Sequence, residues 1–294
     1  MIKRTLFFTN NCHLSTKNEQ LIIAQDKEPV KVPIEDIGYM VLENQQITIS
    51  MPLLDRLAQN NVAVIFCNAA HMPQSMLWPL ESNYVQAELY RSQVAASEPL
   101  KKQLWKQTIE SKINNQARLL KKTGKNSMAL NGLADQVKSG DTTGREGVAA
   151  RKYWNLLFGN SFIRERYGAP PNHWLNYGYI VLRAAVARAL AGSGLLPAFG
   201  IHHHNRYNAF CLADDIMEPY RPYVDEIIID LYEKYPGEER LDTEIKAELL
   251  KVLSCDVVFE NTRRPLMVGL SQTTASLARC FAGEQKKIEY PVFE

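Results

Sequence analysis

The sequence has few cysteines and no recognisable pattern of paired ones. Five cysteines are scattered over 294 residues without any Cys-x-x-Cys spacing, so we expect neither a disulfide framework nor a cysteine zinc site. No stretch approaches the roughly 20 consecutive apolar residues that a membrane-spanning helix needs. The first residues also lack the apolar run and cleavage site of a signal peptide. These absences predict a cytoplasmic protein without a membrane contact, whose cysteines are reduced and lie in the core.

Motifs that bind nucleotides are missing as well. The sequence contains no Gly-x-x-x-x-Gly-Lys-Ser/Thr phosphate loop and no Gly-x-Gly-x-x-Gly fingerprint after a predicted strand. A reaction driven by ATP or by a dinucleotide therefore has no support in the sequence. Any chemistry has to start from bonds that are already activated. A phosphodiester exchange meets this condition, because one such bond forms as another breaks.

The pattern of apolar residues changes at about residue 80. Before that point, short runs bounded by turn residues predict one helix at 52–59 and strands at 4–8, 20–24, 30–34, 38–42 and 62–67. After a proline-containing connector at 71–83, helical periodicity predicts helices at 84–96, 100–122, 128–138, 145–165, 173–191, 212–234, 241–254 and 266–282. The expected fold class is α+β, with a small N-terminal β-rich domain over 1–80 and a larger all-α domain over 81–294. The tail at 283–294 is expected to be frayed or to contact a partner.

Histidines and carboxylates are concentrated between residues 200 and 225. Three consecutive histidines, His202 to His204, precede a helical run that carries Asp214, Asp215 and Glu218. Helical spacing places Glu218 on one face with Asp215 or with Asp214, and two prolines after Glu218 are expected to bend the helix. Imidazoles and carboxylates this close together are what a divalent metal site needs. The alternative is a capped helix with solvated carboxylates beside a surface histidine run.

A second segment, 141–159, has the pattern of an amphipathic helix with one acid near its start. Glu146 is the only acid between Asp141 and Glu165, and basic residues surround it: Arg145, Arg151, Lys152, Arg164 and Arg166. A lone carboxylate in a basic neighbourhood is where a polyanion would be expected to dock. Alternatively, Glu146 is a first-turn glutamate that the helix dipole favours.

Basic residues are concentrated in the middle of the chain. Residues 101–206 contain 17 lysines and arginines against 5 acids, whereas residues 1–100 contain 7 against 10 and residues 207–294 contain 10 against 17. This distribution predicts a surface that binds DNA through its phosphates. The first candidates lie in a lysine-rich stripe over 101–125 whose only acid is Glu110: Lys121, Lys122 and Lys125. If that stripe is only a solvated helix face, the candidates are Arg145, Arg164, Arg166 and Arg183.

Four blocks of sequence together resemble a known family. EGVAARKYW, LNYGYIVLRAA, GIHH and DDIMEPYRPYVD follow one another in the order and approximate spacing of the CRISPR-associated integrases, the enzymes of spacer acquisition. The opening segment, MIKRTLFFTNNCHLSTKNEQLII, also resembles that family, and the GIHH form is similar to the members from type II systems. The resemblance covers most of the chain and implies that the helical region, 81–294, is the catalytic domain.

The resemblance also implies a set of site residues. The family's metal-binding glutamate falls on Glu146, its histidine on His203 and its second acid on Glu218, with Asp215 as an auxiliary candidate. A shift of one residue in the comparison would move the histidine ligand to His202 or His204. The implied cofactor is Mg²⁺ or Mn²⁺.

The implied activity is that of a metal-dependent DNA integrase, which inserts spacers into a CRISPR array by attack of a 3′-hydroxyl on a phosphodiester. The implied partners are double-stranded DNA (the prespacer and the CRISPR repeat), a second copy of the chain in a homodimer, and a small ferredoxin-like CRISPR-associated adaptation subunit. Two alternatives remain open from the residues alone. One is a metal-dependent nuclease acting on branched or single-stranded DNA, and the other is a non-catalytic DNA-binding scaffold.

Overall fold

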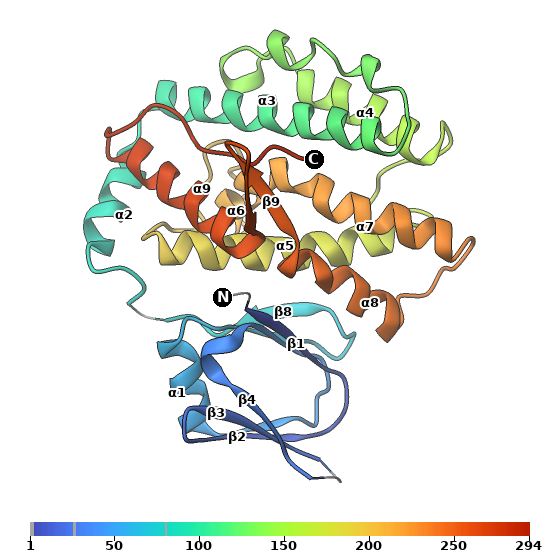
Figure 1. The fold of residues 1–294 in the computed structure, drawn as a ribbon. Helices are drawn as coiled ribbons and strands as arrows, with labels where there is room; N and C mark the ends of the chain where they lie inside the picture. Colours follow the sequence, from blue (N-terminus) through green and yellow to red (C-terminus); the bar gives the residue numbers. More distant parts are fainter. Residues whose placement is uncertain (1–2, 26–27, 80) are drawn as a thin grey trace.

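The computed structural model describes residues 3–25, 28–79 and 81–294, and it divides into a β-rich N-terminal region and a helical region (Figure 1). The N-terminal region holds two four-stranded sheets and one helix. The first sheet has the order β1 (Arg4–Phe8), β5 (Ile37–Leu42), β7 (Ala63–Cys67) and β8 (Pro73–Met76). The second has the order β4 (Val30–Pro33), β3 (Gln20–Ala24), β2 (His13–Lys17) and β6 (Thr48–Ile49), and helix α1 spans Met51–Gln59. The predicted boundary at residue 80 falls on Leu80, which lies outside the described residues.

The first sheet separates two hydrophobic cores. Strand β5 is buried along its whole length, because successive side chains of a strand point to opposite faces of its sheet. Met40 packs into a small core between the two N-terminal sheets and α1, whereas Tyr39 and Val41 pack into the core of the helical region. Strand β7 alternates in the same way, with Val64 in the small core and Ile65 in the large one. One sheet therefore joins the two regions.

The helical region is built around α5, which lies between the first sheet and the layer that contains α3 and α4 (Figure 1). Helix α5 is buried on most sides and apolar nearly all round, as expected for a central helix. The helices are α2 (Gln86–Val94), α3 (Glu98–Lys122), α4 (Arg145–Phe158), α5 (Asn172–Gly192), α6 (Cys211–Ile216), α7 (Arg221–Lys234), α8 (Thr243–Leu249) and α9 (Leu266–Phe281). One antiparallel pair, β9 (Asp256–Phe259) and β10 (Thr262–Pro265), lies between α8 and α9, so this region is not purely helical as predicted.

Two predicted helices differ from the structure for identifiable reasons. The segment 128–138 forms no α-helix but a series of 3₁₀ turns, in which Gly132 and Gly140 have φ values of 73° and 71° that helices do not use. The predicted helix at 212–234 is divided into α6, a 3₁₀ turn at Glu218–Tyr220 and α7. The second difference agrees with the bend expected from the prolines, and it sets the position of Glu218.

The C-terminal segment was expected to be frayed or to contact a partner, and it is instead held by its own chain. Asn115 on α3 donates to the carbonyl of Pro291 (3.0 Å) and accepts from the backbone N–H of Phe293 (3.1 Å). Phe293 is only 1% exposed. The tail therefore packs along α3, the helix that also reaches the candidate site.

Among the described residues, no helix combines the length and the apolar composition needed to cross a membrane. All five cysteines are unpaired, and all but Cys255 are buried, which confirms the expectation of free core cysteines.

Candidate active site

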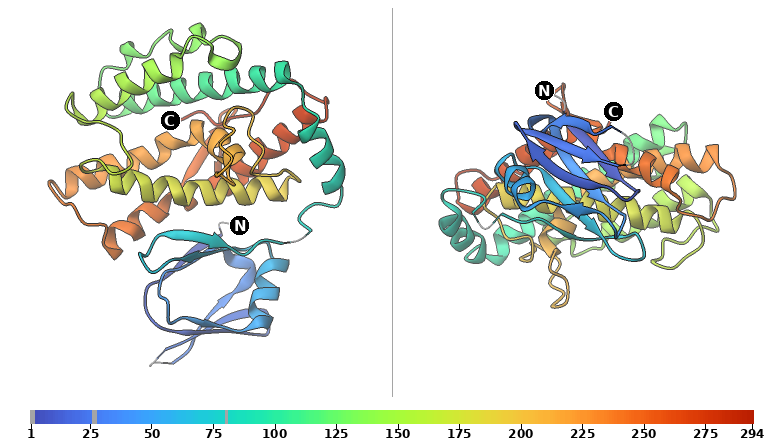
Figure 2. Two further views of the ribbon diagram at one scale, coloured as in Figure 1. Left: turned by 180° about the vertical axis from the view of Figure 1, so that it is seen from behind. Right: turned by 90° about the horizontal axis from the view of Figure 1, so that it is seen from below.

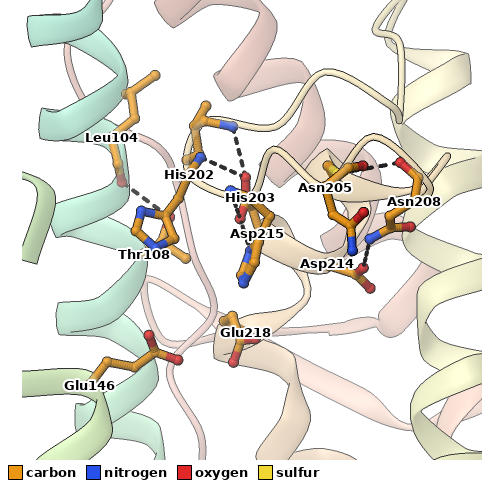
Figure 3. A network of polar contacts seen from close by, with 12 residues as sticks. Leu104, Thr108, Glu146, His202, His203, Asn205, Asn208, Asp214, Asp215 and Glu218 are labelled. Atoms are coloured by element: carbon orange, nitrogen blue, oxygen red, sulfur yellow. Dashed lines mark hydrogen bonds and ion pairs between the residues drawn. The ribbon is translucent and has the colours of Figure 1, made fainter. Parts of the chain in front are cut away.

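A buried lysine joins the two glutamates that the resemblance identified. Lys112, on α3, places its Nζ 2.7 Å from Oε1 of Glu146 in the first turn of α4. The same Nζ lies 2.7 Å from Oε2 of Glu218 in the 3₁₀ turn after α6. The two carboxylate oxygens are therefore separated by no more than twice that distance, and Figure 3 shows the carboxylates facing each other below the histidine turn.

Glu146 is positioned by the start of α4. Gly144 precedes the helix with a φ of 61°, so the chain enters in a left-handed conformation. The carboxylate of Asp141 accepts hydrogen bonds from the backbone N–H groups of Arg145 (2.8 Å) and Glu146 (3.0 Å). These are N–H groups that no helical carbonyl can satisfy, so Asp141 stabilises the helix end and fixes the backbone of Glu146.

Glu218 is buried but ionised. Burial by itself would raise the pKa of its carboxyl, but Arg221 and Lys112 outweigh that effect and lower the pKa to about 2. Arg221 Nε lies 2.9 Å from Oε2, which confirms the helical pairing of these two residues. Among the described residues, Oε2 has two ion-pair contacts but no aligned hydrogen bond. It is a buried, charged oxygen whose lone pairs are not fully used.

Asp215 holds the histidine turn. Its side chain is fully buried and accepts hydrogen bonds from the backbone N–H groups of Ile201 (2.7 Å), His202 (2.9 Å) and His203 (3.3 Å). The turn also requires glycine at Gly200, since an added Cβ would lie 2.4 Å from the carbonyl oxygen of His203. Both carboxylate oxygens of Asp215 are thus already engaged within the turn, which gives this auxiliary candidate a positioning role.

The same carboxylate orients the ring of His203. Asp215 Oδ1 lies 2.5 Å from His203 Nδ1, and this hydrogen bond is the main cause that raises the pKa of the imidazole. With the Nδ1 proton donated to Asp215, Nε2 is the ring nitrogen that carries a free lone pair in the neutral imidazole. Histidines that bind metals commonly have this arrangement, in which a carboxylate fixes the tautomer. Glu218 is close enough to contribute to the raised pKa of His203.

The other two histidines differ in their surroundings. His202 stacks on the buried ring of Trp105, with centroids 4.1 Å apart and planes 2° from parallel, and burial lowers its pKa. His204 is exposed on the loop between α5 and α6, which projects from the helical region in the view from below (Figure 2). Of the three, His203 is the one whose ring is oriented by Asp215.

As the side chains stand, no three histidine, cysteine, aspartate or glutamate residues among those described form a ready metal cluster. The ammonium of Lys112 lies where the two glutamates converge, which accounts for this. The donors themselves suit a hard divalent cation, because they comprise two carboxylates and one neutral imidazole nitrogen. The incompletely satisfied Oε2 of Glu218 agrees with such a ligand. The residues therefore fit Mg²⁺ or Mn²⁺ once the ammonium moves aside.

The sequence analysis placed Lys112 in the solvated lysine stripe, and this was wrong. Lys112 is buried, because its spacing from Ile109 and Gln116 places it on the face of α3 that packs inward. Reading that helical face, rather than counting charges along the chain, would have identified it as a buried lysine. Such a lysine requires acidic partners.

The seven predicted DNA-binding residues do not form a single surface. Arg164, Arg166 and Arg183 line one groove of about 1060 Å³ beside α5 and β8, together with Arg221 and the exposed Tyr167. Lys121 lines a separate hollow of about 820 Å³. Lys122 is engaged within the protein, with its Nζ 2.7 Å from Glu226 and 2.7 Å from the carbonyl of Glu294. Arg145 lies beside Glu146 on α4, and Lys125 follows the end of α3. The groove is the one place where several candidates meet near Glu218.

Comparisons with known proteins agree with this fold and site. The family model described as CRISPR associated protein Cas1 matches residues 6–244, and the chain belongs to the Cas1 family. A CRISPR-associated endonuclease Cas1 of Neisseria meningitidis serogroup C (strain 8013) is 39% identical over 278 residues, which cover 94% of this chain and 91% of the relative. A CRISPR-associated endonuclease Cas1 of Francisella tularensis subsp. novicida is 23% identical over 316 residues, covering 98% and 99%.

Solved structures share the fold. A casposase bound to an integration product matches with a TM-score of 0.78 at 21% identity, covering 99% of this chain and 94% of that one. A Cas1 protein from Thermotoga maritima matches with a TM-score of 0.73 at 19% identity, covering 96% and 98%. A chain of a Cas6-RT-Cas1–Cas2 complex matches with a TM-score of 0.70 at 21% identity, covering 97% of this chain and 35% of that one.

Proposed function

We propose that this protein is a metal-dependent DNA integrase that inserts new spacers into a CRISPR array by attack of a 3′-hydroxyl on a phosphodiester. Its membership of the Cas1 family and its similarity to a casposase bound to an integration product support this proposal. The observation that carries it is the convergence of Glu146 and Glu218 on one cation, beside a histidine oriented by a buried aspartate. Like-charged carboxylates meet in this way where a cation is to be bound.

In this proposal, Glu146, His203 Nε2 and Glu218 hold Mg²⁺ or Mn²⁺. The bound cation would lower the pKa of the attacking hydroxyl and neutralise charge on the phosphate and on the leaving oxygen. Glu218 contributes a carboxylate that stays ionised, because Arg221 and Lys112 keep its pKa low. Asp215 keeps the Nε2 lone pair of His203 available, and no covalent intermediate with the protein is required.

The groove lined by Arg164, Arg166 and Arg183 is the proposed DNA contact. Its guanidinium groups would bind phosphates, and Arg221 at its lining lies beside Glu218, so a strand in the groove would reach the site. The proposed partners are prespacer and repeat DNA, a second copy of the chain, and a small ferredoxin-like adaptation subunit. The similarity to a Cas6-RT-Cas1–Cas2 complex supports such an assembly.

A metal-dependent nuclease that acts on branched or single-stranded DNA is the second candidate. The relatives named as endonucleases favour it, and water would replace the 3′-hydroxyl at the same site. A non-catalytic DNA-binding scaffold has less support, because it gives no reason for two ionised carboxylates to converge.

A strand-transfer assay with a fluorescent prespacer and a supercoiled target separates these candidates. Label joined to the target supports the integrase, and cleavage without joining supports the nuclease. Neither product, in the presence of the partner subunit and Mn²⁺, would leave only the scaffold.

Removal of metal is expected to stop strand transfer completely. After chelation, Mn²⁺ or Mg²⁺ should restore the reaction, whereas Zn²⁺ should not, since it prefers tetrahedral nitrogen and sulfur ligands over this carboxylate-rich set. The measurement is the joined product formed after dialysis against a chelator and addition of each metal. Activity that survives exhaustive chelation would eliminate the proposed mechanism.

Asp215→Asn is expected to lower both stability and activity. An asparagine has one acceptor oxygen, so it cannot accept from the turn N–H groups and orient His203 as the carboxylate does. We expect strand transfer to fall by about 10- to 100-fold, as for other residues that orient a metal ligand. The midpoint of urea unfolding should fall too. Asp214→Asn is the matched control, because Asp214 contacts Asn208 and Arg183 rather than the histidine turn. Equal effects of the two substitutions would contradict the role assigned to Asp215.

Charge reversal in the groove is expected to weaken DNA binding more than charge reversal in the lysine stripe. Arg166→Glu with Arg183→Glu is compared with Lys121→Glu with Lys125→Glu, so that both variants change the charge equally. Each lost duplex phosphate contact should lower the slope of log K against log salt by about 0.9. Binding titrations at several salt concentrations measure that slope. A larger loss of slope in the lysine variant would move the DNA surface to α3 and its end.

A further inference from the structure

Lys112 is a buried lysine placed between two proposed metal ligands. Its side chain is 8% exposed, and its ammonium contacts Glu146 and Glu218 at the same distance of 2.7 Å. A lysine is rarely buried without partners, so these contacts account for its position. The three side chains come from three separate elements: α3, α4 and the 3₁₀ turn at Glu218–Tyr220.

The contacts of Lys112 with the two glutamates are not equivalent. Its hydrogen bond to Glu146 Oε1 is aligned, whereas its contact with Glu218 Oε2 is an ion pair without an aligned hydrogen bond. Glu218 also retains a second cation, Arg221, at 2.9 Å. The ammonium can therefore leave Glu218 without losing a directed hydrogen bond and without leaving that carboxylate unpaired.

The charges of this cluster balance without a metal. Two carboxylates, Glu146 and Glu218, face two cations, Lys112 and Arg221. A divalent cation bound between the carboxylates would stand at contact distance from the ammonium, and like charges at that distance repel strongly in a buried site. The ammonium and the metal cannot both contact the same two oxygens.

We propose that Lys112 is the resident cation of the metal-free site, which holds Glu146 and Glu218 together and is displaced from Glu218 when the divalent metal binds. This inference rests on the proposed metal site. Lys112 would then have two effects: it stabilises the metal-free protein, and it lowers the affinity for metal by competing for the same carboxylates.

Lys112→Met tests both effects, because methionine is unbranched and uncharged and fits a buried position. We expect this variant to bind Mn²⁺ at least about tenfold more tightly, which is a conservative figure for the loss of one like charge at contact distance. Its metal-free form should unfold at a lower temperature than the wild type, and saturating Mn²⁺ should raise that temperature by more than in the wild type. Lys112→Arg keeps the charge and should not tighten binding. Lys121→Met, on the same helix but exposed, is the control for loss of a lysine.

The experiment measures free Mn²⁺ by electron paramagnetic resonance during titration of each full-length protein without DNA, together with thermal unfolding with and without Mn²⁺. Unchanged or weaker Mn²⁺ binding by Lys112→Met would overturn the inference and leave Lys112 as a structural ion pair. His203→Ala separates this outcome from a failure of the metal site itself. If that substitution leaves Mn²⁺ binding unchanged, the metal site is wrong. If it removes binding while Lys112→Met does not tighten it, only the inference about the lysine fails.

A second measurement uses the wild type and does not depend on the folding of a variant. Crystals grown with and without Mn²⁺ should differ at Lys112, with Nζ in contact with Glu218 only in the metal-free form. Contact of Nζ with both carboxylates while Mn²⁺ is bound between them would overturn the inference.

Discussion

His203→Ala is expected to reduce strand transfer by about a thousandfold or more, because it removes the one nitrogen ligand of a site whose metal contributes several kcal/mol of charge stabilisation in the transition state. Stability should change little, since the ring is 46% exposed and its loss leaves the backbone contacts of Asp215 in place. The measurements are the rate of joined-product formation and the midpoint of urea unfolding.

His204→Ala is the matched control, because His204 lies on the same exposed loop without contacting Asp215 in the way that His203 does. It should retain activity within about twofold, since exposed substitutions away from a site change free energies by a few tenths of a kcal/mol. Full activity in His203→Ala, combined with loss in His202→Ala or His204→Ala, would show that the ligand is a neighbouring histidine.

Glu146→Gln and Glu218→Gln are both expected to abolish strand transfer but to differ in stability. Glu146 is 31% exposed, so losing its pair with Lys112 should cost about 1 kcal/mol or less. Glu218 is 5% exposed between Lys112 and Arg221, and its replacement leaves buried cations without their partner. That should lower the free energy of unfolding by about 3–5 kcal/mol.

Urea unfolding of both variants measures this difference, and DNA binding provides a further control. Glu146→Gln should bind DNA as well as the wild type or better, because it removes a negative charge near the phosphate and keeps the size of the side chain. Equal stability of the two variants would contradict the burial and pairing assigned to Glu218. Strand transfer by either variant at the wild-type rate would contradict its role as a ligand.

Much of the N-terminal region could be predicted from sequence, and the strands that were missed share one cause. Strands β1 and β3 have the predicted bounds, because each is an apolar run with clear ends. Strands β2 and β10, with the sequences HLSTK and TRRP, are too polar to stand out. Each belongs to a hairpin closed by two residues with positive φ, Asn18 and Glu19 in one and Glu260 and Asn261 in the other. Such turns usually contain glycine, so neither hairpin carried the expected signal.

The site was predictable in part. Helical spacing correctly paired Glu218 with Arg221 across one turn, and the residues alone indicated that the histidines and acids between 200 and 225 belong together. Spacing did not separate the roles of Asp215 and Glu218, because the prolines turn Glu218 toward α3 while Asp215 faces the histidine turn. Nothing local brings Glu146 to Glu218. That meeting depends on the packing of α3 and α4, and only the family resemblance anticipated it.

The central claim is that Glu146, His203 and Glu218 hold one divalent cation. The most direct test is a crystal of the full-length protein soaked in Mn²⁺ and measured at the manganese absorption edge. We expect a single strong anomalous peak bounded by His203 Nε2 and the carboxylates of Glu146 and Glu218, and its disappearance in His203→Ala crystals. A peak elsewhere on the protein, or no peak at a Mn²⁺ concentration that supports strand transfer, would contradict the claim.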